Sequence, residues 1–454
     1  MSAAPARRCA YAVLRRVFEQ QAYADQALHS ASRGLDARDH ALAMRLAYGA
    51  VQRRLTLDYA IERLAGRPAE RLDAAVLAAL RVGLYELYYL RGAPDRAVVA
   101  DTVELAKEAG SRGYGLVNAV MRRAAREGAG SLFASFGEDT PESAAVMHSH
   151  PPWLAQMWWR ELGAERTRAL MRADNEPGEL ALRVNTLRAG TRADAKAGTD
   201  ADTGAVAAKL GVSTHGDPEL PEALVVQAPL DLHRTAVWQE GGVLAQSRAA
   251  MLVARALDPQ AGERVLDLCA APGGKSTHLA ALMGGEGEVV AVERNPARAE
   301  QLRETARRLG AASVTVEVLD AALPRPDGDR FDRVLVDPPC SGLGTLQARP
   351  DLRWRATPER IAELAALQRK ILAAGAEALR PGGTLVYSTC TISAVENEQL
   401  IEQFLSENSA FTIEDLTSQW PAYAHPRAEH FLLTLPDRDR TAGFFIARMR
   451  RVAG

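Results

Sequence analysis

Strands and helices alternate along the second half of the chain, and this alternation limits the fold more than any other feature. β-rich runs are separated by stretches with helical periodicity. The runs lie at 264–268, 289–293, 314–319, 333–337 and 384–388, and the helical stretches at 275–283, 297–309 and 358–378. Such alternation predicts a parallel, doubly wound α/β sheet, in which ligands bind beyond the carboxyl ends of the strands. We therefore expect a Rossmann-like catalytic domain with its chemistry at those strand ends.

The first part of the chain has a different pattern. Apolar residues recur at helical spacing from residue 5 to residue 126, and the short breaks at 66–68 and 92–95 are rich in Gly, Pro and Asp. Breaks of this kind are typical of helix–helix connections. The pattern predicts a compact all-α domain in front of the catalytic one.

Two stretches have neither pattern. Residues 127–149 are polar and carry Gly, Pro and Ser, which indicates a linker. Residues 189–207 are low in complexity, which indicates a mobile surface insertion. We therefore predict a multidomain chain with three parts: an all-α domain over 1–130, a small α/β subdomain with its linker over 145–235, and the Rossmann-like domain over 236–454.

Composition narrows the class of protein. The four cysteines, Cys9, Cys269, Cys340 and Cys390, show no C-x-x-C pairing, which argues against a zinc site or a disulfide framework and fits a reducing cytoplasm. No apolar run approaches the ~18 residues that a membrane helix needs. Residues 1–126 hold 20 Lys and Arg against 13 Asp and Glu. This basic excess suits a phosphate backbone, but solvated helix faces explain it equally well.

A glycine-bearing loop joins the first strand of the α/β region to a helix. Small residues there let a cofactor approach the backbone, and the helix start supplies unpaired N–H groups. Glu293, 19 residues beyond Gly274, stands at the end of the next strand, where an acid can bind ribose hydroxyls, and Asp320 follows the third strand. The loop is not G-x-G-x-x-G, which disfavours a nicotinamide cofactor. The predicted cofactor-binding loop is Cys269, Ala270, Ala271, Pro272, Gly273, Gly274 and Lys275.

Lys275 is unusual within this chain, because only 5 of its 55 basic residues are lysines. A compact ammonium at a loop-to-helix turn indicates that its shape and hydrogen-bond geometry matter. An ordinary surface lysine near a helix start would be slightly disfavoured by the helix dipole. We therefore interpret Lys275 as a functional residue.

Two cysteines follow the last two strands: Asp337-Pro-Pro-Cys340 and Ser388-Thr-Cys390. Consecutive strands are usually neighbours, so we expect the two side chains to face each other. A thiolate that attacks carbon 6 of cytosine makes carbon 5 nucleophilic enough to take a methyl group. Asp337 is placed to act as the acid at ring nitrogen 3. Residue chemistry alone leaves open whether Cys340 or Cys390 attacks, and Cys9 and Cys269 are expected to be plain buried residues.

These motifs resemble the Sun/Fmu branch of the NOL/NOP/Sun family of RNA cytosine-C5 methyltransferases, over nearly the whole chain. The motifs are the Asp267–Ser276 loop, the Asp337–Gly342 turn, Ser388–Thr391 with the trailing Glu396, and Arg183-Val-Asn-Thr-Leu187. Residues 5–126 are similar to the NusB-type RNA-binding domain. The resemblance implies an enzyme that uses S-adenosyl-L-methionine, bound also by Asp337, to methylate 16S rRNA at cytosine 967. It further implies that Cys390 is the nucleophile and that Cys340 assists product release.

The resemblance also implies a cytoplasmic monomer that acts on unassembled or early-assembly small-subunit RNA. Two positions depart from the family pattern: Gln246-Ser247 stands where Gln-Asp is usual, and Ala442 where Asp is usual. Two alternatives stay open at this point. One is the same chemistry on tRNA or another RNA, and the other is a non-catalytic RNA-binding factor that keeps the cofactor fold as a scaffold.

Overall fold

The computed structural model describes residues 3–90, 92–134, 136–188, 202–325, 328 and 330–453. They form two compact units, each described here by itself. One unit comprises Met1–Pro177 together with Leu346–Arg355, and the other comprises Gly178–Thr345 and Ala356–Gly454. The chain therefore leaves the second unit for ten residues and then returns to it.

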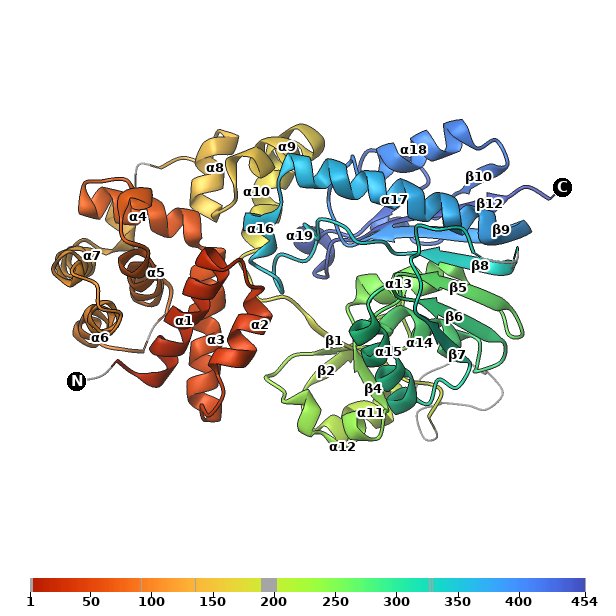
Figure 1. Cartoon of the computed structure of the whole chain (residues 1–454), viewed down its shortest axis with the longest axis horizontal. Coiled ribbons are helices and arrows are strands. Elements are labelled where there is room, and N and C mark those ends of the chain that lie inside the picture. Colours follow the sequence, from red (N-terminus) through yellow and green to blue (C-terminus); the bar gives the residue numbers. More distant parts are fainter. Residues whose placement is uncertain are drawn as a thin grey trace. The chain divides into compact units, whose positions relative to one another are not determined.

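The first unit is helical, as the apolar spacing predicts (Figure 1). Asp36 and Asp73 cap the helices that follow them, since their carboxylates accept backbone N–H groups of the first turn. The helices are α1 (Pro5–Glu19), α2 (Ala24–Ala31), α3 (Ala37–Gln52), α4 (Arg54–Ala65), α5 (Ala74–Tyr89), α6 (Asp95–Glu108), α7 (Tyr114–Phe133), α8 (Pro141–His148), α9 (Pro152–Leu162), α10 (Ala164–Ala173) and α16 (Leu352–Arg355).

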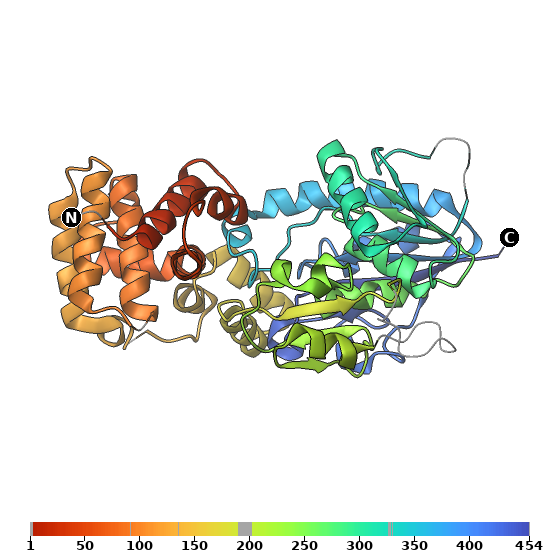
Figure 2. The ribbon, with the colours of Figure 1, turned by 90° about the horizontal axis from the view of Figure 1, so that it is seen from below.

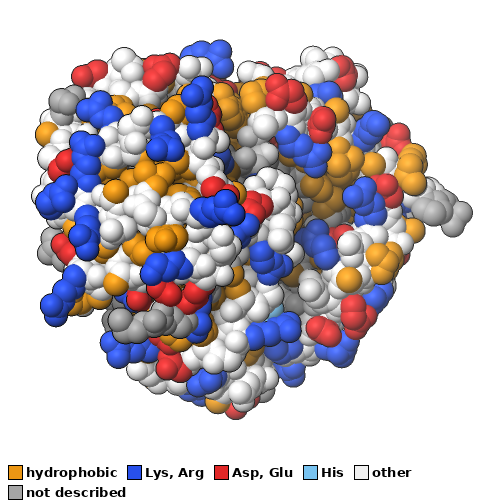
Figure 3. Space-filling view, turned by 60° about the vertical axis from the view of Figure 1, so that its left-hand side comes forward, with side chains coloured by type: hydrophobic (Ala, Val, Ile, Leu, Met, Phe, Trp, Pro, Cys, Tyr) orange, Lys and Arg blue, Asp and Glu red, His pale blue; other side chains and the backbone are white. Residues whose placement is uncertain are grey.

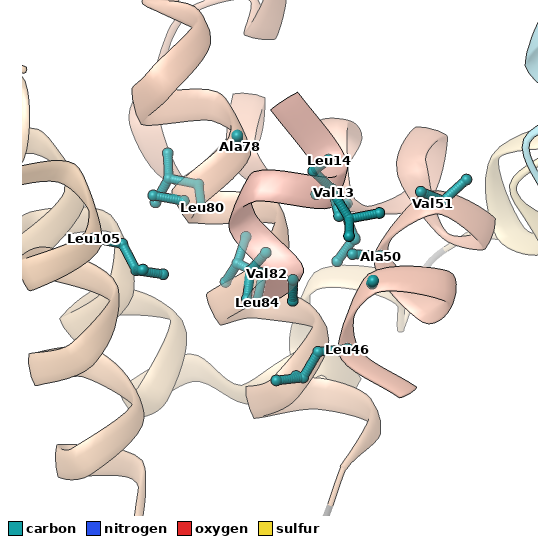
Figure 4. Packing of buried hydrophobic residues seen from close by; sticks show 14 of the residues in the cluster. Val13, Leu14, Leu46, Ala50, Val51, Ala78, Leu80, Val82, Leu84 and Leu105 are labelled. Atoms are coloured by element: carbon teal, nitrogen blue, oxygen red, sulfur yellow. The ribbon is translucent and has the colours of Figure 1, made fainter. Parts of the chain in front are cut away.

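One continuous apolar core holds α1 to α7 together. Figure 4 shows how Val13 and Leu14 of α1 face the side chains of α3 and α5, with Leu105 of α6 at the edge of the cluster. Figure 2 shows the orange helices of this unit running side by side. Since α5 is apolar almost all round its axis and contacts α1, α3, α4, α6 and α7, it is the central helix of this core.

The prediction of a linker over 127–149 is wrong. Helix α7 continues to Phe133 across a non-helical Gly128, and α8 begins at a capping box formed by Thr140 and Ser143. The segment looks like a linker because α8 is short and buries small residues, Ala144 and Ala145, rather than a row of large apolar ones.

The second unit contains the predicted parallel sheet. Its strand order is β10-β12-β9-β8-β5-β6-β7, with β11 paired to β12. The strands β5 to β9 are parallel, and β10, β11 and β12 add antiparallel pairs. Their bounds are β5 (Arg264–Leu268), β6 (Glu288–Val292), β7 (Val314–Glu317), β8 (Phe331–Val336), β9 (Leu379–Thr389), β10 (Phe411–Glu414), β11 (Leu432–Leu433) and β12 (Phe445–Arg451).

Helices cover both faces of this sheet. Figure 1 shows α13, α14 and α15 on one side and α17 and α18 on the other. Their bounds are α13 (Arg248–Leu257), α14 (Gly274–Leu282), α15 (Pro296–Leu309), α17 (Pro358–Ala378) and α18 (Glu398–Glu407), with a short α19 (Pro436–Asp439) near the end of the chain. The predicted multidomain fold, an all-α unit and a Rossmann-like α/β sheet, is thus confirmed.

A small antiparallel sheet precedes the large one within this unit. Its order is β2-β3-β1-β4, and α11 and α12 pack beside it. The bounds are β1 (Leu180–Val184), β2 (Thr214–Gly216), β3 (Ala223–Val226), β4 (Val243–Ala245), α11 (Thr203–Leu210) and α12 (Ala236–Gln239). Most of the insertion expected over 189–207 lies outside the described residues. The end of that range is helical instead, because α11 begins at Thr203 and buries Val206.

The Arg183–Leu187 motif connects the small sheet to the large one. Arg183 is fully buried, and its Nη2 donates a hydrogen bond to Thr277 of α14 at 2.9 Å. Asn185 Nδ2 donates to the carbonyl of Leu309 at the end of α15, at 2.7 Å. These side chains therefore hold two sheets of one unit together.

Among the described residues, no helix is long and apolar enough to cross a membrane. Figure 3 shows Lys and Arg side chains scattered over the face of the molecule that it presents, separated by polar and apolar surface and mixed with Asp and Glu.

Candidate active site

The predicted cofactor loop turns sharply at the end of β5. Cys269 has a φ of 65° and Gly273 a φ of 100°, a region that L side chains rarely adopt. Gly273 is the residue before α14, and a Cβ built on it would lie 3.1 Å from Leu302 Cγ. The glycine is thus required both by the backbone conformation and by the close approach of α15.

A cavity of about 360 Å³ opens beside this loop. Its lining includes three of the predicted cofactor residues, Cys269, Glu293 and Asp320. The other predicted residues, from Ala270 to Lys275 together with Asp337, do not line this cavity. A second hollow of about 460 Å³, beside α15 and β7, contains none of the predicted site residues.

The lining of the first cavity suits an adenosyl group. Glu293 is buried, and one of its oxygens accepts the backbone N–H of Asn295 at 2.8 Å. Asp320 is an exposed residue of the lining, and Val292 and Ile371 supply apolar surface for a flat base. Carboxylates can accept hydrogen bonds from ribose hydroxyls and from an adenine amine. The residues present therefore fit the cofactor that the motifs imply.

The two predicted cysteines meet, as their strand positions indicate. β8 and β9 are parallel neighbours, and Cys340 Sγ lies 3.2 Å from Cys390 Sγ, with both residues half-buried. The hydrogen bond with Cys390, together with burial, raises the pKa of Cys340 well above that of an ordinary thiol.

Lys275 and Asp337 form an ion pair beside the cysteines. Lys275 Nζ lies 2.6 Å from Asp337 Oδ2, and Ser388 donates to Asp337 Oδ1 at 3.1 Å. Burial alone would lower the pKa of Lys275, but the Asp337 carboxylate outweighs it, and this pKa lies above its ordinary value. Lys275 is thus an ammonium, and it lies 5.0 Å from the ring centroid of Phe444.

Sequence reasoning missed Ser388 and Phe444. Ser388 orients Asp337 from the neighbouring strand, and its place two residues before Cys390 is a signal that could have identified it. Phe444 comes from the segment before β12, and no local pattern links it to Lys275. Such partners depend on tertiary contacts that strand and helix periodicity does not report.

In the remaining two cysteines, the surroundings disfavour the thiolate. Cys9 lies in the helical core, and burial raises its pKa. Burial, with nearby carboxylates, raises the pKa of Cys269 to about 12. Within the described part of the chain, no group of three or more Cys, His, Asp or Glu side chains is arranged to hold a metal ion.

Comparison with known proteins identifies the family. The model described as 16S rRNA methyltransferase RsmB/F matches residues 254–450. The NusB family model matches 4–126, and an RsmF/B-like ferredoxin-like domain matches 150–233. A protein of Bacillus subtilis, named probable ribosomal RNA small subunit methyltransferase B, is 36% identical over 95% of this chain and 96% of its own length. The chain belongs to the RsmB/F family of 16S rRNA methyltransferases.

A second relative and a solved structure match the chain over a similar extent. Ribosomal RNA small subunit methyltransferase B of Vibrio cholerae is 35% identical over 84% of either chain. The crystal structure of PH0851 has a TM-score of 0.80 and 26% identity, and covers 99% of this chain and 100% of its own. The resemblance to Sun/Fmu-type methyltransferases and the assignment as a methyltransferase are therefore confirmed.

One departure from the family pattern has a local explanation. Ser247, where the family usually has Asp, is the N-cap of α13, and its hydroxyl accepts the N–H of Ala250 at 3.2 Å. Ser and Asp are comparable caps, so the helix start is preserved. Ala442 carries no carboxylate, but its carbonyl accepts a hydrogen bond from Thr434 at 2.7 Å.

Proposed function

We propose that this methyltransferase transfers a methyl group to carbon 5 of a cytosine in small-subunit rRNA, with Cys390 as covalent nucleophile. The single observation that carries the proposal is the pair of sulfur atoms 3.2 Å apart at the ends of β8 and β9, beside the Lys275–Asp337 ion pair. An amino-group methyltransferase has no use for two adjacent thiols. The family of the chain supports small-subunit rRNA as the substrate.

The proposed reaction begins when the Cys390 thiolate forms a bond to carbon 6 of the cytosine. The electron pair of the 5,6 double bond moves towards ring nitrogen 3, which takes up a proton from the Lys275–Asp337 pair through Asp337 and returns it when the product is released. Carbon 5 then takes the methyl group from the sulfonium sulfur of S-adenosyl-L-methionine, which keeps the electron pair of the broken S–CH3 bond. A base removes the proton from carbon 5, the double bond re-forms, and the bond between Cys390 Sγ and carbon 6 breaks, with Cys340 assisting release.

The charges of the chain favour Cys390 over Cys340 as the attacking sulfur. The ammonium of Lys275 interacts with Cys390, and an adjacent cation stabilises a thiolate. The hydrogen bond with Cys390 and burial are the main causes that raise the pKa of Cys340, and the carboxylates of Glu396 and Asp337 add to them. This asymmetry supports the assignment that family resemblance implies, and it comes from the chain itself.

S-adenosyl-L-methionine supplies the methyl group in this proposal. Glu293 would bind the ribose hydroxyls, Asp320 the adenine amine, and the loop from Cys269 to Lys275 would approach the cofactor through its backbone. The target base must leave its stack to reach sulfur atoms that are half-buried.

The proposed target is the cytosine at position 967 in bacterial 16S numbering, in unassembled or early-assembly small-subunit RNA, with the enzyme acting as a cytoplasmic monomer. The NusB-type helical unit supports this, because it carries the basic excess of the chain and matches a family model over 4–126. Arginine-rich surfaces bind RNA through its phosphates.

The deciding experiment is bisulfite sequencing of total RNA from a strain that lacks the gene and from the same strain carrying it. Loss of one 5-methylcytosine in 16S rRNA, restored by the gene, is the expected result. Loss of a methylcytosine only in tRNA would overturn the rRNA assignment. An unchanged 5-methylcytosine pattern would overturn the proposed chemistry.

A further inference from the structure

Glu396 is a buried carboxylate with no cationic partner. It is fully buried in the segment between β9 and α18, and no Lys, Arg or His of the described residues forms an ion pair with it. Burying an unpaired carboxylate costs free energy unless hydrogen bonds replace the lost water.

The hydrogen bonds of Glu396 reach both cysteine turns. Its Oε1 accepts the backbone N–H of Ser341, the residue after Cys340, at 2.9 Å, and its Oε2 accepts the Ser341 hydroxyl. The Ser341 hydroxyl also lies 2.6 Å from the hydroxyl of Thr391, the residue after Cys390. Glu396 thus holds together the residues that follow the two sulfur-bearing positions.

Further hydrogen bonds hold the carboxylate and the backbone of Glu396 in place. Gln368 of α17 donates from Nε2 to Glu396 Oε1 at 3.0 Å and to the carbonyl of Pro339 at 3.0 Å. The Tyr387 hydroxyl donates to the backbone carbonyl of Glu396 at 2.8 Å. Gln368, Tyr387 and Glu396 are buried, so these hydrogen bonds replace the water that the carboxylate loses.

The charged and titratable groups around the two sulfurs are unevenly placed. Cys340 faces Cys390, Asp337, Glu396 and the Tyr387 hydroxyl. The Lys275 ammonium interacts with Cys390 and Asp337. A fixed carboxylate on one side and an ammonium on the other make the two thiols chemically different, although they lie in contact.

We propose that Glu396 is a positioning residue that holds the Cys340 turn against the Cys390 turn and keeps Cys340 as the protonated member of the pair. Its meaning for catalysis rests on the proposed function, in which the two sulfurs have different roles. The difference in protonation between the two thiols does not depend on any RNA substrate and can be measured without one.

The test is the pH dependence of alkylation by iodoacetamide, followed separately at Cys340 and Cys390 by peptide mass spectrometry on the full chain. Wild type is compared with Glu396→Gln and with the control Glu398→Gln. Glu398 is also a buried glutamate, but it pairs with His425 and Arg427. In Glu396→Gln the midpoint for Cys340 should fall by about one pH unit, because a fixed negative charge is lost. Glu398→Gln should leave both midpoints unchanged.

An unchanged Cys340 midpoint in a folded Glu396→Gln variant would overturn the proposal, whatever the methylation assay shows. If the midpoint shifts in Glu396→Gln but the wild-type enzyme forms no 5-methylcytosine, the proposed function is overturned and the assignment of Glu396 stands. Should Glu396→Gln not fold, Ser341→Ala tests the positioning role. It removes one hydroxyl from the network and keeps the charge. Turnover should then fall at least tenfold with an unchanged Cys340 midpoint, and wild-type turnover would refute the proposal.

Discussion

At the scale of residues, the proposed function gives Cys390 and Cys340 different roles, and these roles decide what each substitution should do. Cys390→Ala should abolish methylation but leave cofactor binding within about twofold, because the thiol meets the base and not the adenosyl cavity. Turnover by Cys390→Ala at the wild-type rate would show that the nucleophile is wrongly assigned.

Cys340→Ser should instead accumulate a covalent enzyme–RNA adduct, visible as a slow band on a denaturing gel.

Asp267 makes the stability of the protein depend on pH. Burial raises its pKa to about 7, although Ser276 donates a hydrogen bond to it at 2.6 Å. The unfolded chain loses this proton near pH 4, so between about pH 4 and 7 folding takes up a proton, and stability falls as pH rises through that window.

Asp267→Asn removes this pH dependence. The stability that the variant gains over wild type should be about 2.5 kcal/mol larger at pH 8 than at pH 5, because most of the window in which the buried carboxyl holds its proton lies between these two pH values. Urea unfolding at both pH values measures the difference. An equal change in the free energy of unfolding at both pH values would contradict the explanation.

At the scale of elements, the loop that carries Gly344 and the loop that carries Gly443 are in backbone contact near the cysteines. Gly443 donates its N–H to the carbonyl of Gly344 at 2.7 Å, and Gly344 donates to the carbonyl of Cys390 at 3.0 Å. A Cβ on Gly344 would lie 1.9 Å from the Gly443 oxygen, which no side-chain adjustment can relieve. Main-chain hydrogen bonds therefore connect the segment after Cys340 both with Cys390 and with the segment before β12.

Gly344→Ala should destabilise the α/β unit by at least about 2 kcal/mol and lower methylation at least tenfold, because these loops must separate. Gly204→Ala, in helix α11 of the same unit, is the control. Its added Cβ makes only ordinary contact at 3.7 Å, and alanine favours the helix. Equal thermal stability and activity of the two variants would contradict this account of the loop contact.

Elements whose apolar residues recur at a regular spacing could be predicted from the sequence. Features that depend on partners distant in sequence could not. Strand β5 and helix α17 have the predicted bounds. β8 and β9 are neighbours in the sheet, as predicted, and this brings both cysteines together. β9 begins at Leu379, five residues earlier than its apolar run, because that residue pairs with Phe331. Phe444 reaches the site through a tertiary contact for which the sequence carries no local signal. Ser388 and Glu396 lie near Cys390 in sequence, but their partners, Asp337 and Ser341, do not follow from that position.

At the scale of the whole molecule, the path of the chain is the least predictable feature. Leu346–Arg355 lies between two stretches of the α/β unit in sequence but is part of the helical unit. Arg353 anchors it there and is fully buried. Its guanidinium donates to the carbonyls of Ser149 at 3.0 Å and Asp174 at 3.1 Å, and to Asn175 Oδ1 at 3.0 Å. Burial lowers the pKa of Arg353 to about 10, so the group stays charged at neutral pH.

Arg353→Ala should therefore destabilise the helical unit by about 3 kcal/mol, since it leaves three buried acceptors without a donor and opens a cavity. The control is Arg355→Ala on the same short helix. Its hydrogen bond to the Gln21 carbonyl is exposed, and its loss should cost less than about 1 kcal/mol. Calorimetry with and without S-adenosyl-L-methionine separates the units, because the cofactor should raise only the transition of the unit that binds it. Arg353→Ala should lower the other transition, and an effect no larger than that of Arg355→Ala would show that the segment is not anchored by this residue.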